Sequence, residues 1–318
     1  MKILVTGGAG FIGSTVVDAY LRAGHDMVIV DDLSSGSGSA DNVDPRARWY
    51  RVDLRTPQLD DVFATERPEI VNHHAAQVSV SRSVEDPMHD ATVNVLGSLN
   101  LLEAARRHRT RRVIFASTGG AIYGEPDVLP ADEDHACRPR SPYAVAKLSV
   151  EHYLDYFRAI FGLEAVVLRY ANVYGPRQDP HGEAGVIAIF MQRIQNGLAP
   201  MIFGDGEQTR DFVFVGDVVR ANVAALDVPT HGQLKVFNIA TGRGTSVNEL
   251  WDVIAAAACP AVTPARGPDR PGDVRHSVLD PARAARELGW TPSVPLADGI
   301  ARTWQWFVDR AARDRCAV

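Results

Sequence analysis

The stretch Lys2-Ile-Leu-Val-Thr6, followed at once by Gly7-Gly8-Ala9-Gly10-Phe11-Ile12-Gly13, decides the fold. Its first part is a short apolar run of the kind that forms a buried parallel strand. Glycines at 7, 10 and 13 would permit a tight turn, let the backbone approach a pyrophosphate, and let the following helix point its N-terminal N–H groups at the anion. The spacing is G-x-x-G-x-x-G and not the commoner G-x-G-x-x-G, so a plain glycine-rich connector is the competing interpretation.

A second predicted strand, Met27–Val30, ends in two acidic residues, Asp31 and Asp32. A carboxylate at this position accepts hydrogen bonds from an adenosine ribose and would repel a 2′-phosphate. We therefore expect NAD, and not NADP, as the cofactor. Helix capping is the simpler explanation of Asp31 taken alone.

Strand-like and helix-like segments alternate along the first half of the chain, which predicts an α/β fold with a doubly wound parallel sheet. From Ala171 onward the sequence pattern indicates loops and short helices, which predicts a smaller, interleaved C-terminal lobe that binds the substrate. The predicted division is residues 1–170, with 211–240 returning to them, and 171–210 with 241–318. The segments read as strands are Trp49–Leu54, Ile70–His74, Arg112–Ser117 and Ala165–Arg169, and those read as helices are Thr92–His108 and Tyr143–Phe161.

Composition is typical of a globular cytoplasmic enzyme: of 318 residues, 46% are hydrophobic and 23% charged, and the net charge is −6. This charge gives no sign of nucleic-acid or membrane binding. The three cysteines are odd in number and widely spaced, which argues against a disulfide framework, and no cysteine or histidine pair has metal-ligand spacing, so we expect no metal. No secretion signal or membrane span is predicted.

The pair Tyr143 and Lys147 is the best clue to chemistry. The chain has only three lysines, and this one lies four residues after a tyrosine in a predicted helix, so the two side chains share a face. An ammonium beside a phenol favours its ionised form and would make the tyrosine a proton carrier near neutral pH. An ordinary exposed pair on a helix surface is the alternative.

Several motifs occur together in a fixed order and carry a family resemblance. They are Gly7-x-x-Gly10-x-x-Gly13, Asp31-Asp32, Asp53-Leu54, His74-Ala75-Ala76-Gln77, Asn94-Val95-x-Gly97, Ser117-Thr118, Tyr143-x-x-x-Lys147 and Arg169-Tyr170-x-Asn172. Together they resemble the extended short-chain dehydrogenase/reductase superfamily, nearly end to end. Later segments, among them Asn172-Val-Tyr-Gly-Pro-Arg177 and Arg270-Pro-Gly-Asp273, resemble its nucleotide-sugar branch.

The resemblance implies a Rossmann fold and an isomerase that inverts C4 of a UDP-sugar through transient oxidation to a 4-keto sugar, with NAD as the hydride carrier. Tyr143 would take the proton of the sugar 4-hydroxyl, and Lys147 would hold Tyr143 ionised and bind the nicotinamide ribose. Thr118 would donate a hydrogen bond to the same oxygen. The step from Thr118 to Tyr123-Gly124 is one residue longer than usual, which leaves Ser117 a rival.

The same resemblance assigns the remaining site residues. The cofactor side would comprise Gly7, Gly10, Phe11, Ile12, Gly13, Asp31, Asp32, Ser34, Ser35, Gly36, Asp53, Leu54, His74, Ala75, Ala76, Gln77, Asn94, Ser117, Tyr143, Lys147 and Tyr170. The substrate side would comprise Thr118, Tyr143, Asn172, Val186, Phe203, Arg210, Arg270, Asp273 and Ser277, with the arginines on the diphosphate and Phe203 against uracil. A small residue at 277 predicts room for an N-acetyl group.

Related dehydratases and decarboxylases place a carboxylate just after the Ser/Thr, where this chain has Gly119 and Gly120, which favours simple oxidation and re-reduction. UDP-glucose with UDP-galactose is the first expectation, with the N-acetylated pair or UDP-glucuronate as alternatives. A one-way NAD-dependent reductase and a non-catalytic binding protein are the other classes. Apolar residues on the helices Thr92–His108 and Tyr143–Phe161 favour a homodimer.

Overall fold

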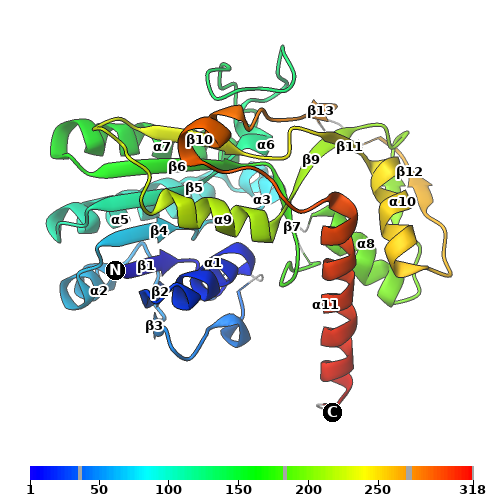
Figure 1. The fold of residues 1–318 in the computed structure, drawn as a ribbon, viewed down its shortest axis with the longest axis horizontal. Helices are drawn as coiled ribbons and strands as arrows, with labels where there is room; N and C mark the ends of the chain where they lie inside the picture. Colours follow the sequence, from blue (N-terminus) through cyan, green and yellow to red (C-terminus); the bar gives the residue numbers. More distant parts are fainter. Residues whose placement is uncertain (35–37, 182–184, 270–273, 317–318) are drawn as a thin grey trace.

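A seven-stranded parallel sheet forms the centre of the molecule (Figure 1). The computed structural model describes residues 1–34, 38–181, 185–269 and 274–316, without the side chains of 314–316. The strand order is β10-β6-β5-β4-β1-β2-β3, and it reverses between β1 and β4. The predicted doubly wound Rossmann sheet is therefore confirmed. The strands are β1 (Lys2–Thr6), β2 (Asp26–Val30), β3 (Arg48–Tyr50), β4 (Ile70–His73), β5 (Arg112–Thr118), β6 (Glu164–Tyr170) and β10 (Lys235–Ile239).

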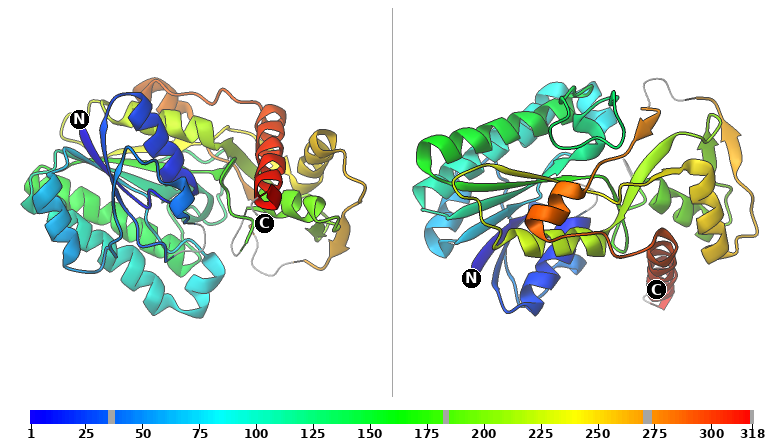
Figure 2. Two further views of the ribbon diagram at one scale, coloured as in Figure 1. Left: turned by 90° about the horizontal axis from the view of Figure 1, so that it is seen from below. Right: turned by 45° about the horizontal axis from the view of Figure 1, so that its top comes forward.

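Helices cover both faces of this sheet, and the left view of Figure 2 shows the sheet between the two layers. Because successive strand residues point to opposite faces, Ile3 packs in one hydrophobic core and Leu4 in the other. The first core lies under α1 (Phe11–Arg22) and α9 (Val215–Ala225). The second lies under α2 (Gln58–Glu66), α5 (Gly97–Arg107) and α7 (Pro142–Phe161).

Two predicted elements differ from the structure. The strand expected over Trp49–Leu54 ends at Tyr50, because Asp53 accepts hydrogen bonds from the N–H of Arg55 and the hydroxyl of Thr56 and so forms a local turn. The helix expected over Thr92–His108 begins earlier, as α3 (Val80–Glu85) and α4 (Pro87–Ala91). It then passes through a π-helical turn, η2 (Thr92–Leu96), before α5. Such π-helical turns often mark functional sites.

The long helix α7 has clear start and stop signals. The hydroxyl of Ser141 accepts a hydrogen bond from the N–H of Ala144, 3.2 Å away, and Pro142 follows at the first helical position. Gly162, with a φ of +71°, ends the helix in the left-handed conformation. The predicted helix Tyr143–Phe161 is confirmed to within one residue.

A second lobe is built from short strands and three helices around its own hydrophobic core. One small sheet contains β7 (Asn172–Tyr174), β9 (Thr209–Phe214), β11 (Gly244–Ser246) and β13 (His276–Ser277), and a separate pair contains β8 (Met201–Phe203) and β12 (Ala265–Gly267). The helices are α8 (Val186–Gln195), α10 (Val247–Ala258) and α11 (Leu296–Cys316). The remaining short elements are α6 (Gly119–Ile122), η1 (Ala40–Asn42) and η3 (Ala284–Leu288).

The chain crosses between the lobes more than once. It enters the second lobe after β6, returns with α9 and with β10, which pairs with β6, and leaves again through β11. The chain returns to the first lobe once more at Trp290, whose side chain packs in the first core. Because of these crossings the two lobes share the edge where β5 and β6 end. The residue boundaries predicted for the lobes stay a prediction.

Candidate active site

The glycine turn after β1 is shaped for close backbone approach. Gly7 has a φ of +67°, and a Cβ there would lie 2.7 Å from the nitrogen of Ala75. A Cβ on Gly13 would lie 2.1 Å from the carbonyl oxygen of Gly7. No side chain caps α1, so the N–H groups of its first turn, at Phe11, Ile12 and Gly13, face outward from Gly10 without helical partners. The turn is therefore a cradle for an anion such as a pyrophosphate.

The acidic residues after β2 brace the same turn. Asp31 accepts hydrogen bonds from the N–H of Ala9 and of Leu33, both at 2.9 Å, and its pKa is raised because it is half-buried. Asp32 accepts from the N–H of Ser34. The helix-cap explanation of Asp31 is wrong, since its carboxylate joins the glycine turn to the end of β2. Ser35 and Gly36 lie outside the described residues.

Asp53 and Leu54, which are predicted to bind the cofactor, lie in the turn after β3. The carboxylate of Asp53 forms a bidentate ion pair with Arg55, with one contact at 2.6 Å, which lowers its pKa. Leu54 is partly buried and lies against Gly97, which leaves room for it. Contact with an adenine ring stays a prediction for both.

The segment His74-Ala75-Ala76-Gln77 follows β4 and faces the glycine turn. The His74 ring lies 3.2 Å from the hydroxyl of Tyr170, and burial and the charge of Lys147 lower its pKa to about 3, so the ring is neutral. Gln77 and Asn94 bind each other through two hydrogen bonds of 2.9 Å between the Asn94 amide and the Gln77 backbone. Asn94 lies in the π-helical turn η2.

Neighbouring hydroxyls at the end of β5 have different surroundings. Ser117 is buried and donates a hydrogen bond of 2.6 Å to Glu151, which in turn forms a buried ion pair with Arg169. Thr118, on the opposite side of the strand, is partly exposed at the carboxyl edge of the sheet. The geometry therefore favours Thr118 over Ser117 as the hydroxyl that meets a substrate.

Tyr143 and Lys147 lie together on α7 beside the end of β5. The Lys147 ammonium donates to the carbonyl of Ala116 at 3.0 Å and lies 5.9 Å from the centre of the Tyr143 ring. Burial lowers the pKa of Lys147 to about 8. Tyr143 keeps part of its surface open, yet burial of the rest, with the charge of Asp90, raises its pKa. Without NAD the pKa of Tyr143 therefore moves up, with burial as the main cause, and the lowering predicted for the tyrosine beside Lys147 and the nicotinamide stays a prediction.

Apart from Thr118 and Tyr143, the predicted substrate residues within the described ranges lie on the second lobe. Asn172 starts β7 and is exposed, and its amide oxygen lies 3.6 Å from where a Cβ on Gly120 would be. Arg210 and Ser277 are register partners in the pair β9 and β13, Val186 begins α8, and the partly exposed Phe203 ends β8. Arg270 and Asp273 lie outside the described residues.

Sequence reasoning missed two buried carboxylates near the tyrosine and lysine. Glu151 is the next step of the series Tyr143, Lys147, Glu151, each four residues apart on α7. Asp90 precedes Asn94 by four residues and accepts a hydrogen bond from its amide. Both could have been found as acidic residues at helical spacing from a residue already singled out.

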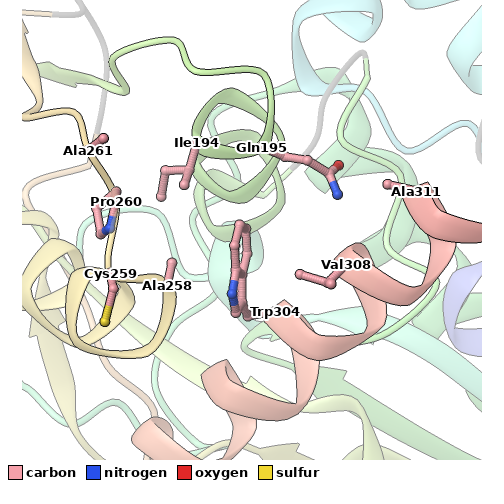
Figure 3. Close-up of a pocket in the computed structure, with 9 residues that line it drawn as sticks. All are labelled: Ile194, Gln195, Ala258, Cys259, Pro260, Ala261, Trp304, Val308 and Ala311. Atoms are coloured by element: carbon pink, nitrogen blue, oxygen red, sulfur yellow. The ribbon is translucent and has the colours of Figure 1, made fainter.

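A separate hollow of about 330 Å³ lies between the second-lobe helices α8, α10 and α11 (Figure 3). Its lining offers no carboxylate, amine or imidazole, so it is not the reaction site. Across the described ranges, no group of His, Cys, Asp and Glu could hold a metal ion, and no helix is long and apolar enough to cross a membrane. The lining residues are Ile194, Gln195, Ala258, Cys259, Pro260, Ala261, Trp304, Val308 and Ala311.

Together, the cradle before α1, the acidic brace after β2 and the tyrosine–lysine pair at the end of β5 define a dinucleotide-dependent enzyme of the α/β class. The model of the NAD-dependent epimerase/dehydratase family matches residues 3–240. The chain belongs to this family, which confirms the predicted superfamily and NAD as its cofactor.

Similarity to characterised relatives extends over the whole chain. It is 48% identical to a UDP-glucose 4-epimerase of Mycolicibacterium smegmatis over 98% of this chain and 100% of the relative. The crystal structure of UDP-glucose 4-epimerase with UDP-glucose from Thermotoga maritima has a TM-score of 0.94, 48% identity, and coverage of 98% and 100%. The Thermus thermophilus enzyme in complex with NAD has a TM-score of 0.90, 45% identity, and coverage of 97% and 99%.

Proposed function

We propose that this chain is an NAD-dependent isomerase that inverts C4 of a UDP-sugar, with UDP-glucose and UDP-galactose as the first pair. The observation that carries the proposal is the placement of Thr118, Tyr143 and Lys147 at the carboxyl edge of the sheet, one strand away from the point between β4 and β1 where the strand order reverses. Ligands of doubly wound folds bind at that point. The relatives named above act on this kind of sugar.

Tyr143 moves the proton of the sugar 4-hydroxyl, and Thr118 holds the same oxygen with a hydrogen bond. Since burial raises the pKa of Tyr143 in the protein alone, the phenol needs positive charge nearby to ionise. Lys147 supplies one such charge from the same helix. NAD, when bound, supplies the hydride acceptor and donor and a second positive charge.

The glycine cradle with Asp31, Gln77 and Asn94 would hold NAD on the first lobe. Arg210 and Asn172 would hold the UDP part on the second lobe through charge-assisted and neutral hydrogen bonds. Inversion requires that the nucleotide stays anchored while the keto sugar turns over. This requirement fits an arrangement in which Arg210 and Asn172 hold the nucleotide on the second lobe while Thr118 and Tyr143 act on the sugar from the first.

The structure at Gly119 favours epimerisation over dehydration. A Cβ at residue 119 would lie 2.2 Å from the Leu279 side chain, so a carboxylate next to Thr118 does not fit here without repacking. Elimination of water needs such an added acid or base. The remaining alternatives are UDP-glucuronate as the substrate and one-way reduction of a nucleotide sugar.

We also propose that two copies pair through an apolar face on α3, α4, η2 and α7. Val145, Tyr156 and Ile160 are 49%, 50% and 61% exposed and follow one stripe of α7, because they are spaced near multiples of a helical turn. Val84, Met88 and Leu96 extend the face from the adjacent helices, with exposures of 62%, 76% and 57%. An apolar face of this extent favours a protein partner.

The test is to incubate the protein separately with UDP-galactose, UDP-N-acetylgalactosamine and UDP-galacturonate, without added reductant, and to follow the anomeric signals by proton NMR. Conversion of UDP-galactose to UDP-glucose is expected. The variant Tyr143→Phe should lose at least about a hundredfold in rate, since it lacks the group that moves the proton. If no sugar converts even with NAD supplied, the proposal fails and a reductase or a binding protein takes its place.

A further inference from the structure

Asp90 on α4 is a buried carboxylate that the reaction scheme above does not use. Its side chain is 1% exposed. One oxygen, Oδ1, accepts hydrogen bonds of 2.9 Å from the side-chain amides of both Gln77 and Asn94. These are the two residues that close on each other at the cofactor side of the cleft, so Asp90 fixes both.

The second oxygen of Asp90, Oδ2, is buried and makes no hydrogen bond with any described group. A carboxylate oxygen left without a donor is costly, so its charge must be balanced by its surroundings. The titratable groups that face it from α7 are Lys147 and Tyr143, and His89 lies beside it on α4.

The other elements packed around Asp90 carry only uncharged or solvent-exposed groups. The π-helical turn η2 has no ionisable residue, and Arg82 and Glu85 on α3 are exposed to solvent. The imidazole of His74 is neutral above pH 3, since burial lowers its pKa to about 3. The Lys147 ammonium is therefore the positive charge that balances this carboxylate.

The influence between Asp90 and the reacting pair runs in both directions. Burial raises the pKa of Asp90 while Gln77 and Lys147 lower it. Burial lowers the pKa of Lys147, and the charges of Asp90 and, to a smaller extent, of Glu151 on the same helix act against that, which favours the protonated ammonium. The same charge raises the pKa of Tyr143.

We propose that Asp90 is a positioning residue of the active site, which holds Gln77 and Asn94 with one carboxylate oxygen and provides the buried counter-charge of Lys147 with the other. The role in catalysis rests on the proposed function, whereas the link to Lys147 is a property of the protein alone. It can therefore be measured without any turnover.

The experiment uses the small number of lysines. Protein labelled with ¹³C at the lysine side chains should give three ε-carbon signals, from Lys2, Lys147 and Lys235, and the variant Lys147→Met identifies the central one. In Asp90→Asn, which keeps an oxygen for both amides but removes the charge, the pKa of Lys147 should fall by about one unit or more below that of the unchanged protein. The matched control Glu85→Gln, with the same charge change on an exposed site, should leave it unchanged.

An unchanged pKa of Lys147 in a folded Asp90→Asn protein would overturn the proposal. If this variant does not fold, the unchanged protein provides the test. Its Lys147 signal should shift a second time at acid pH, as Asp90 takes up its proton. A single titration step of that signal would contradict the link between Asp90 and Lys147. Should the NMR result hold while no UDP-sugar converts, the proposed reaction fails and the pairing of Asp90 with Lys147 stands.

Discussion

The two lobes contribute different kinds of structure to the candidate site. The first lobe offers a turn in which glycines are required by contact, a braced carboxylate and a buried polar layer, all at the ends of parallel strands of one seven-stranded sheet. The second lobe offers partly exposed side chains, such as Phe203 and Arg210, on strands of three and six residues. With NAD on the first lobe and the sugar on the second, as proposed above, the cofactor would meet closely packed backbone and the sugar would meet partly exposed side chains.

The largest expected effect separates the neighbouring hydroxyls of the first lobe. Thr118→Val should lower kcat by roughly a hundredfold to a thousandfold, because it removes a hydrogen bond to the reacting oxygen. Ser117→Ala should leave the reacting hydroxyl in place and act mainly on stability, since Ser117 bonds to buried Glu151. Steady-state rates and melting temperatures of both variants test this. A larger rate loss in Ser117→Ala would reverse the assignment.

The rigidity of the glycine turn can be tested next with a matched pair of variants. Gly7 and Gly24 both have a positive φ, +67° and +80°, but a Cβ meets backbone only at Gly7 and open space at Gly24. Gly24→Ala should cost about 1 kcal/mol of unfolding free energy from backbone strain alone. Gly7→Ala should cost about 3 kcal/mol and also weaken NAD binding, because residues 74 and 75 must move. Equal losses would mean that close approach at Gly7 does not matter.

On the second lobe, Arg210→Ala should raise the KM for the UDP-sugar by roughly tenfold to fiftyfold, through loss of charge-assisted hydrogen bonds to the diphosphate. NAD content should not change. The control is Arg243→Ala, an exposed arginine paired with Glu249 at the start of β11. A KM that responds equally to both arginines would point to general electrostatics, which added salt would abolish.

The smallest expected effect concerns the sugar. Ser277 is buried beside Arg210, and Ser277→Tyr should lower turnover of UDP-N-acetylglucosamine by about tenfold relative to UDP-glucose, because the added ring takes up space. Ser277→Ala is the control for a change that adds no volume. Competition between the two sugars in one NMR sample measures the ratio directly, and an unchanged ratio would remove Ser277 from the sugar site.

Much of the site could be predicted because each of its motifs is local. The glycine turn, the acidic end of β2 and the spacing of Tyr143 and Lys147 depend on neighbours within a strand, a turn or one helical turn. What is not local was missed or misjudged. Asp90 and Glu151 also have partners that packing brings to them, Gln77 for Asp90 and Ser117 for Glu151. The strand predicted to Leu54 failed for a different reason, because the local turn at Asp53 replaces strand structure there.

The sequence by itself determined the class of fold and the family, and it singled out the tyrosine–lysine pair, because these follow from residue type and short spacing. Only the tertiary structure decided that Ser117 is buried against Glu151 while Thr118 stays partly exposed, and in which direction burial moves the pKa of Tyr143. Both results depend on burial. The first depends on which side of β5 is covered by α7, and the second on how much water is removed from the Tyr143 phenol. Desolvation is a property of the assembled neighbourhood, which residue spacing does not specify.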